Sequence, residues 1–164
     1  MVPIVTIDGP SGSGKGTIAK ALALKLAWNY LDSGLLYRCF AFLHNQNTDN
    51  ISEAFSRLEH KYDFQSENIL FDGNDITSIL RGKEITILSS QLSQRTEVRE
   101  QLMQIQKQYR ELPGLVAEGR DMSSKLFPDS KVKIYLTADL SERVNRRANQ
   151  LRNDGQKVNI SELK

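Results

Sequence analysis

A glycine-rich stretch near the start of the chain, "TIDGPSGSGKGTIAK" (Thr6–Lys20), constrains the fold more than any other feature. Before it, Val2–Asp8 is short, rich in β-branched residues and closed by glycine, which predicts a buried strand. From Lys15 onward, apolar residues recur at helical spacing with alanines between them, which predicts a helix. The chain therefore opens with a strand, a loop and a helix.

Three later apolar runs predict further strands, at Trp28–Leu31, Leu115–Ala117 and Val132–Thr137. The last two are apolar enough to be covered on both faces. Helical patterns lie between these runs. Strands that alternate with helices predict an α/β fold with a parallel sheet flanked by helices.

Two of the helical patterns are well defined. In the first pattern, the apolar residues from Ile51 to Tyr62 are separated by four, three and four positions, and Ser52 is the expected N-cap. The second runs from Val98 to Tyr109, and Pro113 and Gly114 should end it. Both helices are expected to pack one apolar face on the core.

The segment Tyr62–Ile79 breaks the alternation, because β-prone runs are separated there by polar turns. Asp72–Asp75, with the sequence DGND, is typical of a hairpin turn. We expect a small antiparallel insert rather than a second full domain. A chain of 164 residues is long enough for one domain with a sizeable core.

Composition excludes several classes of partner and site. The 22 basic and 20 acidic residues form no basic stripe, which argues against a nucleic-acid partner. Cys39 is the only cysteine, so it is expected to be a small buried hydrophobe and not part of a disulfide or a thiolate zinc site. His44 and His60, on predicted helices, have no companions at metal-ligand spacing, so no metal site is predicted.

No apolar run approaches the roughly 20 residues that a membrane-spanning helix needs. The N-terminus also lacks the basic patch and apolar stretch of a secretion signal. The expectation is a cytoplasmic protein without a membrane partner.

The glycine-rich stretch matches the phosphate-loop pattern G-x-x-x-x-G-K through Gly9, Gly14 and Lys15. A plain Gly/Ser turn is the alternative, but the position between a strand and a helix favours a loop whose amides and lysine bind nucleotide phosphates. The residues expected to bind the donor nucleotide are Gly9, Pro10, Ser11, Gly12, Ser13, Gly14, Lys15, Gly16 and Thr17.

Gly16 follows the lysine where the generic pattern has Ser or Thr, and Thr17 comes one place later. This G-K-G-T form resembles that of nucleoside monophosphate kinases. The stretch "IDGPSGSGKGT" and three further segments look like bacterial cytidylate kinases in order and spacing; the three are "LDSGLLYR", "EVREQLMQIQKQYRELPGLVAEGRDM" and "FPDSKVKIYLTA". The resemblance covers essentially the whole chain and implies transfer of a phosphoryl group from ATP to CMP or dCMP with Mg²⁺, by a monomer.

The resemblance also implies a division of the chain into a single P-loop NTPase kinase domain with three parts. These are a core at about 1–34 and 88–140, a region for the nucleoside monophosphate at about 35–87 with the small sheet at 62–79, and a partial lid at 141–164. Family members continue through a longer lid and a closing helix and strand, which this sequence lacks. If the chain is the whole molecule, we expect strongly impaired turnover with some nucleotide binding retained.

The acceptor residues are implied by matching motif positions. Asp121, Ser90 and Arg99 would recognise cytosine, because its exocyclic amine donates and its ring positions accept. Arg38 and Arg120 would bind the acceptor phosphate and, with Lys15, make up the expected catalytic residues. Ser33 and Tyr37 would line the same acceptor site, with a core role for Tyr37 as the alternative.

Several roles stay open at this level. Arg143, Arg146, Arg147 and Arg152 form either a lid-side cluster or a solvated helical face. Asp8 or Glu118 either orients water on magnesium or caps a strand end, and Ser123-Ser124 replaces the family's usual glycine and threonine. A kinase of another small acceptor, such as AMP or shikimate, and a non-catalytic nucleotide-binding protein are the alternative functions.

Overall fold

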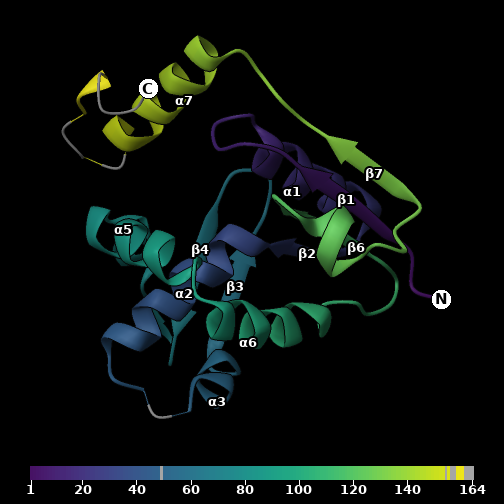
Figure 1. The fold of residues 1–164 in the computed structure, drawn as a ribbon, viewed down its shortest axis with the longest axis horizontal. Helices are drawn as coiled ribbons and strands as arrows, with labels where there is room; N and C mark the ends of the chain where they lie inside the picture. Colours follow the sequence, from purple (N-terminus) through teal and green to yellow (C-terminus); the bar gives the residue numbers. More distant parts are fainter. Residues whose placement is uncertain (49, 154, 156–157, 161–164) are drawn as a thin grey trace. The chain divides into compact units, whose positions relative to one another are not determined.

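The computed structural model describes residues 1–48, 50–153, 155 and 158–160. The chain divides into two compact units, one made of Met1–Leu31 with Glu111–Lys164 and the other of Asp32–Arg110. Figure 1 traces the chain through both units from the N-terminus to the C-terminal helix.

A four-stranded sheet with the order β2-β6-β1-β7 forms the centre of the first unit. β1 is parallel to both of its neighbours, β6 and β7, and its Asp8 is level with Gly119 and Tyr135. Helix α1 packs on β6. The elements are β1 (Ile4–Asp8), α1 (Lys15–Leu26), β2 (Asn29–Asp32), β6 (Leu115–Gly119), the short π-helix η1 (Met122–Leu126), β7 (Val132–Tyr135) and α7 (Leu140–Asn153).

The centre of this sheet is apolar on both faces, as the runs of β-branched residues predict. Every residue of β1 and β6 is buried, and Ile7, Leu115 and Val116 have almost no exposed surface. Ala19 and Ala23 are the buried residues of α1, and their small side chains let the helix lie close to the sheet. The predicted parallel sheet is confirmed, and its buried strands give the following loops a fixed base.

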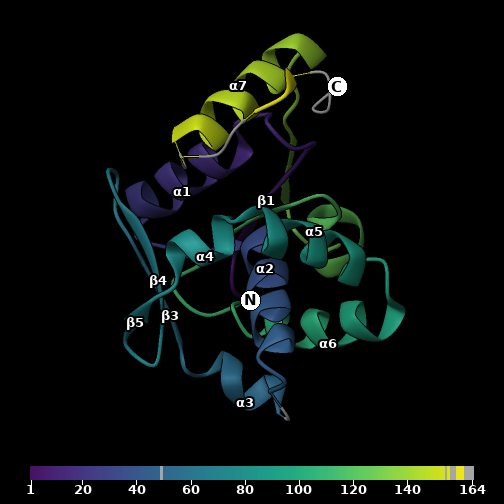
Figure 2. The same ribbon diagram turned by 90° about the vertical axis from the view of Figure 1, so that its left-hand side faces the viewer.

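The second unit is built on helix α2, which packs against α3, α4, α5 and α6. Leu80, Leu92 and Leu102, from α4, α5 and α6, are fully buried in it. Figure 2 shows this group of helices together with the small sheet β3-β4-β5. The elements are α2 (Ser33–Asn45), α3 (Ile51–Phe55), β3 (Leu58–Tyr62), β4 (Glu67–Phe71), β5 (Asn74–Asp75), α4 (Thr77–Arg81), α5 (Lys83–Leu92) and α6 (Thr96–Lys107).

The small sheet is antiparallel, as predicted, and its hairpin lies in the expected place. Phe71 pairs with Asn74, so Asp72 and Gly73 form a two-residue loop. Both have positive φ, 51° and 77°, the backbone conformation that a type I′ turn requires and that Asp-Gly adopts readily. The sheet spans residues 58–75, however, so the predicted range of 62–79 is wrong at both ends.

The helix predicted over Ile51–Tyr62 is also wrong beyond its first turns. Helix α3 ends at Phe55, and Leu58–Tyr62 is strand β3, in which half-buried and exposed residues alternate. The apolar residues at 58 and 62 are compatible with both periods, and pairing with β4 decides for the strand. His60 consequently lies in a strand, and the N-cap is Asn50 rather than Ser52 because the Asn50 side chain accepts from the Glu53 amide at 3.1 Å.

Strand β7 departs from the expectation that both of its faces are covered. All four of its residues are exposed, Tyr135 to 71%. β7 is an edge strand of the sheet and pairs with β1 on one side. This pairing satisfies backbone groups on that side, but it does not cover the two faces of the strand. Cys39, in contrast, is buried as predicted. Among the described helices, none has the length and hydropathy to cross a membrane.

The two candidate caps of α3 can be separated by substitution. Asn50→Ala removes the acceptor for the Glu53 amide and should lower the free energy of unfolding by about 1 kcal/mol. Ser52→Ala, at an exposed position inside the helix, should change it by less than about 0.5 kcal/mol. Urea unfolding followed by circular dichroism measures both, and a larger loss for Ser52→Ala would contradict the observed cap.

Candidate active site

The glycine-rich loop connects the buried end of β1 to the first turn of α1, as the sequence predicts. The amide of Gly9 donates to the carbonyl of Gly119 at 3.2 Å, and the amide of Ser13 donates to the carbonyl of Pro10 at 3.4 Å. Helix α1 begins at Lys15, where the Ile18 amide bonds back to the Gly14 carbonyl. The loop thus ends at the amino end of a helix, where unpaired amides favour an anion.

Gly12 and Gly14 adopt left-handed conformations, with φ of 77° and 91°. A Cβ atom at Gly12 would lie 2.7 Å from the carbonyl oxygen of Arg143, and one at Gly14 would lie 3.3 Å from Nη1 of Arg146. Both positions therefore need glycine for the backbone turn and for the close approach of α7. These two glycines therefore determine the backbone conformation of the loop.

The loop contains a polar atom that suits a ligand. The hydroxyl oxygen of Ser13 is buried and makes no hydrogen bond to any part of the chain that the structure describes. A buried hydroxyl without a partner is costly, and a phosphate oxygen would supply one. The residues Gly9, Pro10, Ser11, Gly12, Ser13, Gly14, Lys15, Gly16 and Thr17 are therefore contiguous in a loop and helix start whose chemistry fits an anionic nucleotide tail.

Lys15 lies beside a buried carboxylate at the end of the neighbouring strand. Its Nζ is 3.6 Å from Oε2 of Glu118, and the hydroxyl of Tyr30 donates to the other oxygen, Oε1, at 3.4 Å. Glu118 and Tyr30 are only 5% and 4% exposed. Each oxygen of this carboxylate thus has its own partner, which a buried charge requires.

Gly16 makes room for the same carboxylate. A Cβ at Gly16 would lie 3.0 Å from Oε1 of Glu118 and 3.9 Å from the Tyr30 hydroxyl. This contact gives a physical reason for the G-K-G-T form, because a larger residue after Lys15 would press on a buried side chain that is held on both oxygens.

The carboxylate of Asp8 accepts hydrogen bonds from the residues that follow β6. Its Oδ1 accepts from the Met122 amide at 2.8 Å, and its Oδ2 accepts from the amide and the hydroxyl of Ser123 at 2.9 and 2.6 Å. The capping interpretation of Asp8 is therefore the one that the contacts favour. The side chain of Ser123, where the family usually has glycine, supplies one of these three hydrogen bonds.

Arg120 and Asp121 follow β6 directly, at the carboxyl edge of the sheet where ligands bind in α/β folds. Arg120 is exposed, and Asp121 is half-buried with Oδ2 at 3.7 Å from Nζ of Lys125. Because the ends of β1 and β6 are level, this pair of residues and the glycine-rich loop belong to the same edge of one sheet.

In the second unit, three predicted acceptor residues lie in the first two turns of α2. Asp32 caps this helix by accepting from the Leu35 amide at 2.8 Å. Ser33 is buried, Tyr37 is half-buried, and Nη2 of Arg38 is 3.7 Å from Oδ2 of Asp32. Nε of Arg38 is buried without a hydrogen-bond partner among the described residues, so this guanidinium retains capacity for an anion.

The two remaining acceptor candidates come from the helices that pack on α2. Ser90 is an exposed residue of α5, and its carbonyl accepts from the Ser93 hydroxyl at 2.8 Å. Arg99 is half-buried on α6. Because α5 and α6 both contact α2, the second unit holds Ser33, Tyr37, Arg38, Ser90 and Arg99 on three adjoining helices.

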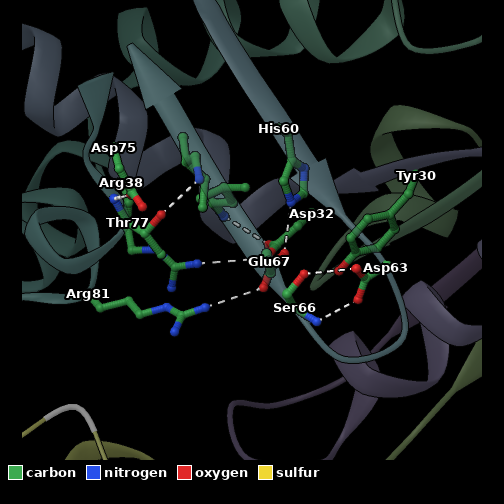
Figure 3. A network of polar contacts seen from close by, with 12 residues as sticks. Tyr30, Asp32, Arg38, His60, Asp63, Ser66, Glu67, Asp75, Thr77 and Arg81 are labelled. Carbon is green, nitrogen blue, oxygen red and sulfur yellow. Dashed lines mark hydrogen bonds and ion pairs between the residues drawn. The ribbon is translucent and has the colours of Figure 1, made fainter. Parts of the chain in front are cut away.

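A polar network surrounds Glu67 on β4, as Figure 3 shows from close by, and no sequence pattern predicts it. Oε1 of Glu67 is 2.8 Å from Nε2 of His60, and Oε2 is 3.5 Å from Nη2 of Arg81. The nearby Asp75 accepts from the Thr77 amide at 2.8 Å, and the hydrogen bonds of Thr77 hold the pKa of that carboxyl below its usual value. Pairing of β3 with β4 brings residues 60 and 67 together, and packing of α4 on β4 adds residue 81, so their spacing carried no signal.

The described residues contain no cluster of three or more His, Cys, Asp or Glu side chains that could hold a metal by themselves. Burial raises the pKa of the Cys39 thiol to about 12, so this thiol is not a nucleophile near neutral pH. The groups near the glycine-rich loop that can bind an anion are backbone amides and the side chain of Lys15.

Comparison with known proteins shows the family of this chain. Residues 5–164 match the family model described as "Cytidylate kinase". The chain belongs to the cytidylate kinase family. It is 46% identical over 172 residues to the cytidylate kinase of Stutzerimonas stutzeri, covering 99% of this chain and 75% of that protein.

Two further relatives have similar sequence identity and coverage. The cytidylate kinase of Pseudomonas fluorescens is 42% identical, with 99% of this chain and 76% of that protein covered. That of Shewanella oneidensis is also 42% identical, with 98% and 74% covered. A Thermus thermophilus protein of known structure, TT1252, aligns with a TM-score of 0.47 at 20% identity over 99% of this chain and 76% of that one, too low to establish a shared fold.

The packing of Glu118 on Gly16 can be tested through stability. Gly16→Ala improves helix propensity, yet we expect it to lower the free energy of unfolding by about 1 kcal/mol because the new methyl group displaces the buried carboxylate. The double variant Gly16→Ala/Glu118→Asp, with a shorter side chain, should recover part of that loss. Urea unfolding of the single and double variants measures both effects, and a more stable Gly16→Ala protein would contradict the packing.

Proposed function

We propose that this member of the cytidylate kinase family transfers the terminal phosphoryl group of ATP to CMP, and to dCMP, producing ADP and CDP or dCDP. The observation that carries the proposal is the glycine-rich loop with its unpartnered buried Ser13 hydroxyl, its helix start at Lys15 and the Gly16–Glu118 contact. Together these features supply several donors and one cation at a single edge of the sheet.

The donor nucleotide is proposed to bind at this loop. The amides of the loop and of the first turn of α1 would bond to phosphate oxygens, and Lys15 would neutralise part of their charge. Lys15 is then shared between Glu118 and the phosphates. Because Glu118 also accepts from Tyr30, its position does not depend on the ligand, and the lysine is held near the place where charge must be neutralised.

Magnesium fits this arrangement as a companion of the nucleotide. It supplies charge neutralisation and fixed geometry at the donor phosphates when it is bound. Glu118 and Thr17 are the residues of this chain that would face its water shell. Asp8 is a poorer candidate, since both of its oxygens already accept hydrogen bonds from residues 122 and 123.

The acceptor phosphate is proposed to bind Arg38 and Arg120. Arginine suits this role because its planar fork bonds two oxygens at once and stays charged. The attacking phosphate oxygen is ionised near neutral pH, so no general base is needed. The protein's contribution is to orient and neutralise two anions while the P–O bond to the acceptor forms and the P–O bond to ADP breaks.

Preference for cytosine is proposed to rest on Asp121, with Ser90 and Arg99 as donors and Ser33 and Tyr37 lining the acceptor site. A carboxylate accepts from the exocyclic amine of cytosine, whereas uracil presents a carbonyl oxygen at that position. Two acceptors facing each other in a dry site are costly, so UMP should be rejected. AMP and shikimate lack the same pattern of donors and acceptors.

Activity of the full chain tests the proposed function directly. A coupled ADP-release assay with Mg·ATP should show turnover with CMP and dCMP and at least about tenfold lower kcat/KM with UMP and AMP. Lys15→Ala should abolish most of the CMP-dependent rate. Equal rates with AMP would favour the alternative acceptor, and nucleotide binding without any turnover would favour a non-catalytic protein.

The role of Asp121 is tested by comparing two ligands. Asp121→Ala should weaken CMP binding by about tenfold or more, because the cytosine amine loses a charged acceptor, and should leave Mg·ATP binding nearly unchanged. Isothermal titration calorimetry measures both affinities. Glu100→Ala, an exposed carboxylate on α6, is the matched control. Equal weakening of the two ligands by Asp121→Ala would contradict a role in base recognition.

A further inference from the structure

Three arginines of helix α7 make different kinds of contact. Nη1 of Arg152 donates to Oδ1 of Asn149 at 3.0 Å, within its own helix. Nε of Arg143 donates to the carbonyl of Ala138 at 3.1 Å, just before the helix. Nη1 of Arg146, in contrast, donates at 3.1 Å to the carbonyl of Ser13, inside the glycine-rich loop and 133 residues earlier in the chain.

The guanidinium of Arg146 is held in place from its other side. Its Nε and Nη2 donate to the same oxygen of Glu142, at 3.2 and 2.8 Å, one helical turn away. An exposed ion pair of this kind contributes little stability by itself. Its effect here is geometric, because two contacts to one carboxylate fix the plane of the fork and direct Nη1 to the loop.

The acceptor that Arg146 binds lies in a critical peptide unit. The carbonyl of Ser13 and the amide of Gly14 belong to one planar peptide group and point in opposite directions. A contact that fixes the Ser13 oxygen therefore fixes the direction of the Gly14 N–H, and a cation on the oxygen polarises that N–H as a donor. Gly14 has φ of 91°, and a glycine restrains the rotation of this peptide less than a residue with a side chain would.

We propose that Arg146, oriented by Glu142, is a positioning residue that sets the Ser13–Gly14 peptide so that its amide faces the donor phosphates. The proposal rests on the proposed function, in which this loop binds ATP. Close packing supports it, because a Cβ at Gly14 would lie 3.3 Å from Nη1 of Arg146 and one at Gly12 would lie 2.7 Å from the Arg143 carbonyl. Two glycines of the loop thus leave space for α7 as well as for a phosphate.

Binding of Mg·ATP to the full chain, measured by isothermal titration calorimetry, tests this role. Arg146→Ala should weaken Mg·ATP binding by about tenfold, the effect of losing one charge-assisted hydrogen bond. Arg146→Lys keeps the charge but lacks the planar fork that fixes the directions to Ser13 and Glu142, so it should recover only part of the affinity. Glu142→Gln should weaken binding by about twofold. Lys131→Gln, which removes an exposed charge in the same unit, is the control and should bind as the wild type does.

Two readouts distinguish positioning from a general structural role. CMP affinity of Arg146→Ala should equal that of the wild type, whereas a damaged fold would weaken both ligands. In the Arg146→Ala background, Glu142→Gln should have no further effect, because Glu142 acts through Arg146. The Gly14 amide resonance in a ¹⁵N spectrum of the ligand-free protein should also shift in Arg146→Ala and stay in place in Lys131→Gln.

The opposite results would overturn the inference. These are Mg·ATP affinity of Arg146→Ala within about twofold of the wild type, additive losses in the double variant, or equal losses for CMP and Mg·ATP. Failure of the proposed function looks different, because the wild-type chain itself would then bind no Mg·ATP. That result would overturn both proposals, whereas equal binding by wild type and variant would overturn this one alone.

Discussion

The carboxylate of Asp8 joins the ends of two strands, and the arrangement of the candidate site depends on that connection. It takes three hydrogen bonds from residues 122 and 123, just beyond β6, while its own backbone leads into the glycine-rich loop. Its carbonyl also accepts from the Leu136 amide at 2.8 Å, which ties in the segment after β7. These contacts fix where three chain segments leave the sheet. The segments lead to Lys15, from Arg120 into η1, and to the start of α7.

Close backbone packing around the loop follows from this. A Cβ atom at Gly9 would lie 2.1 Å from the Leu136 carbonyl, and one at Gly12 would lie 2.7 Å from that of Arg143. The loop is therefore enclosed by the segments that Asp8 organises, and its amides are oriented before a ligand arrives. An oriented set of donors is worth more to an anion than a flexible one, because the cost of ordering them has already been met in folding.

The parts of the structure that could be predicted from sequence depend on local patterns. The buried strands β1 and β6 and the Asp72-Gly73 turn are set by apolar runs and by turn chemistry, so they were predicted correctly. The helix over residues 51–62 was predicted wrongly, because Leu58 and Tyr62 fit both periods and only pairing with β4 makes them a strand. The exposure of β7 was missed because burial depends on neighbours in space.

The residues of the candidate site also fall into those that a local sequence pattern predicts and those that it does not. The loop residues could be found from a motif, since the spacing of glycine and lysine reflects the backbone chemistry directly. Tyr30, Glu142 and the Ser13–Arg146 contact carried no such signal, because each depends on segments that are distant in sequence or on the direction of a single side chain. The Glu67 network is another case, because strand pairing brings His60 to Glu67 and the packing of α4 on β4 adds Arg81.

Cys39 has a practical consequence for experiments on this protein. It is the only sulfhydryl in the sequence, it is buried in α2, and burial raises its pKa to about 12. Maleimide and iodoacetamide dyes react with thiolates at accessible positions, so the native chain should stay unlabelled under mild conditions. A cysteine introduced at an exposed position would then be the one site labelled by a fluorophore, and Cys39 would not have to be replaced first.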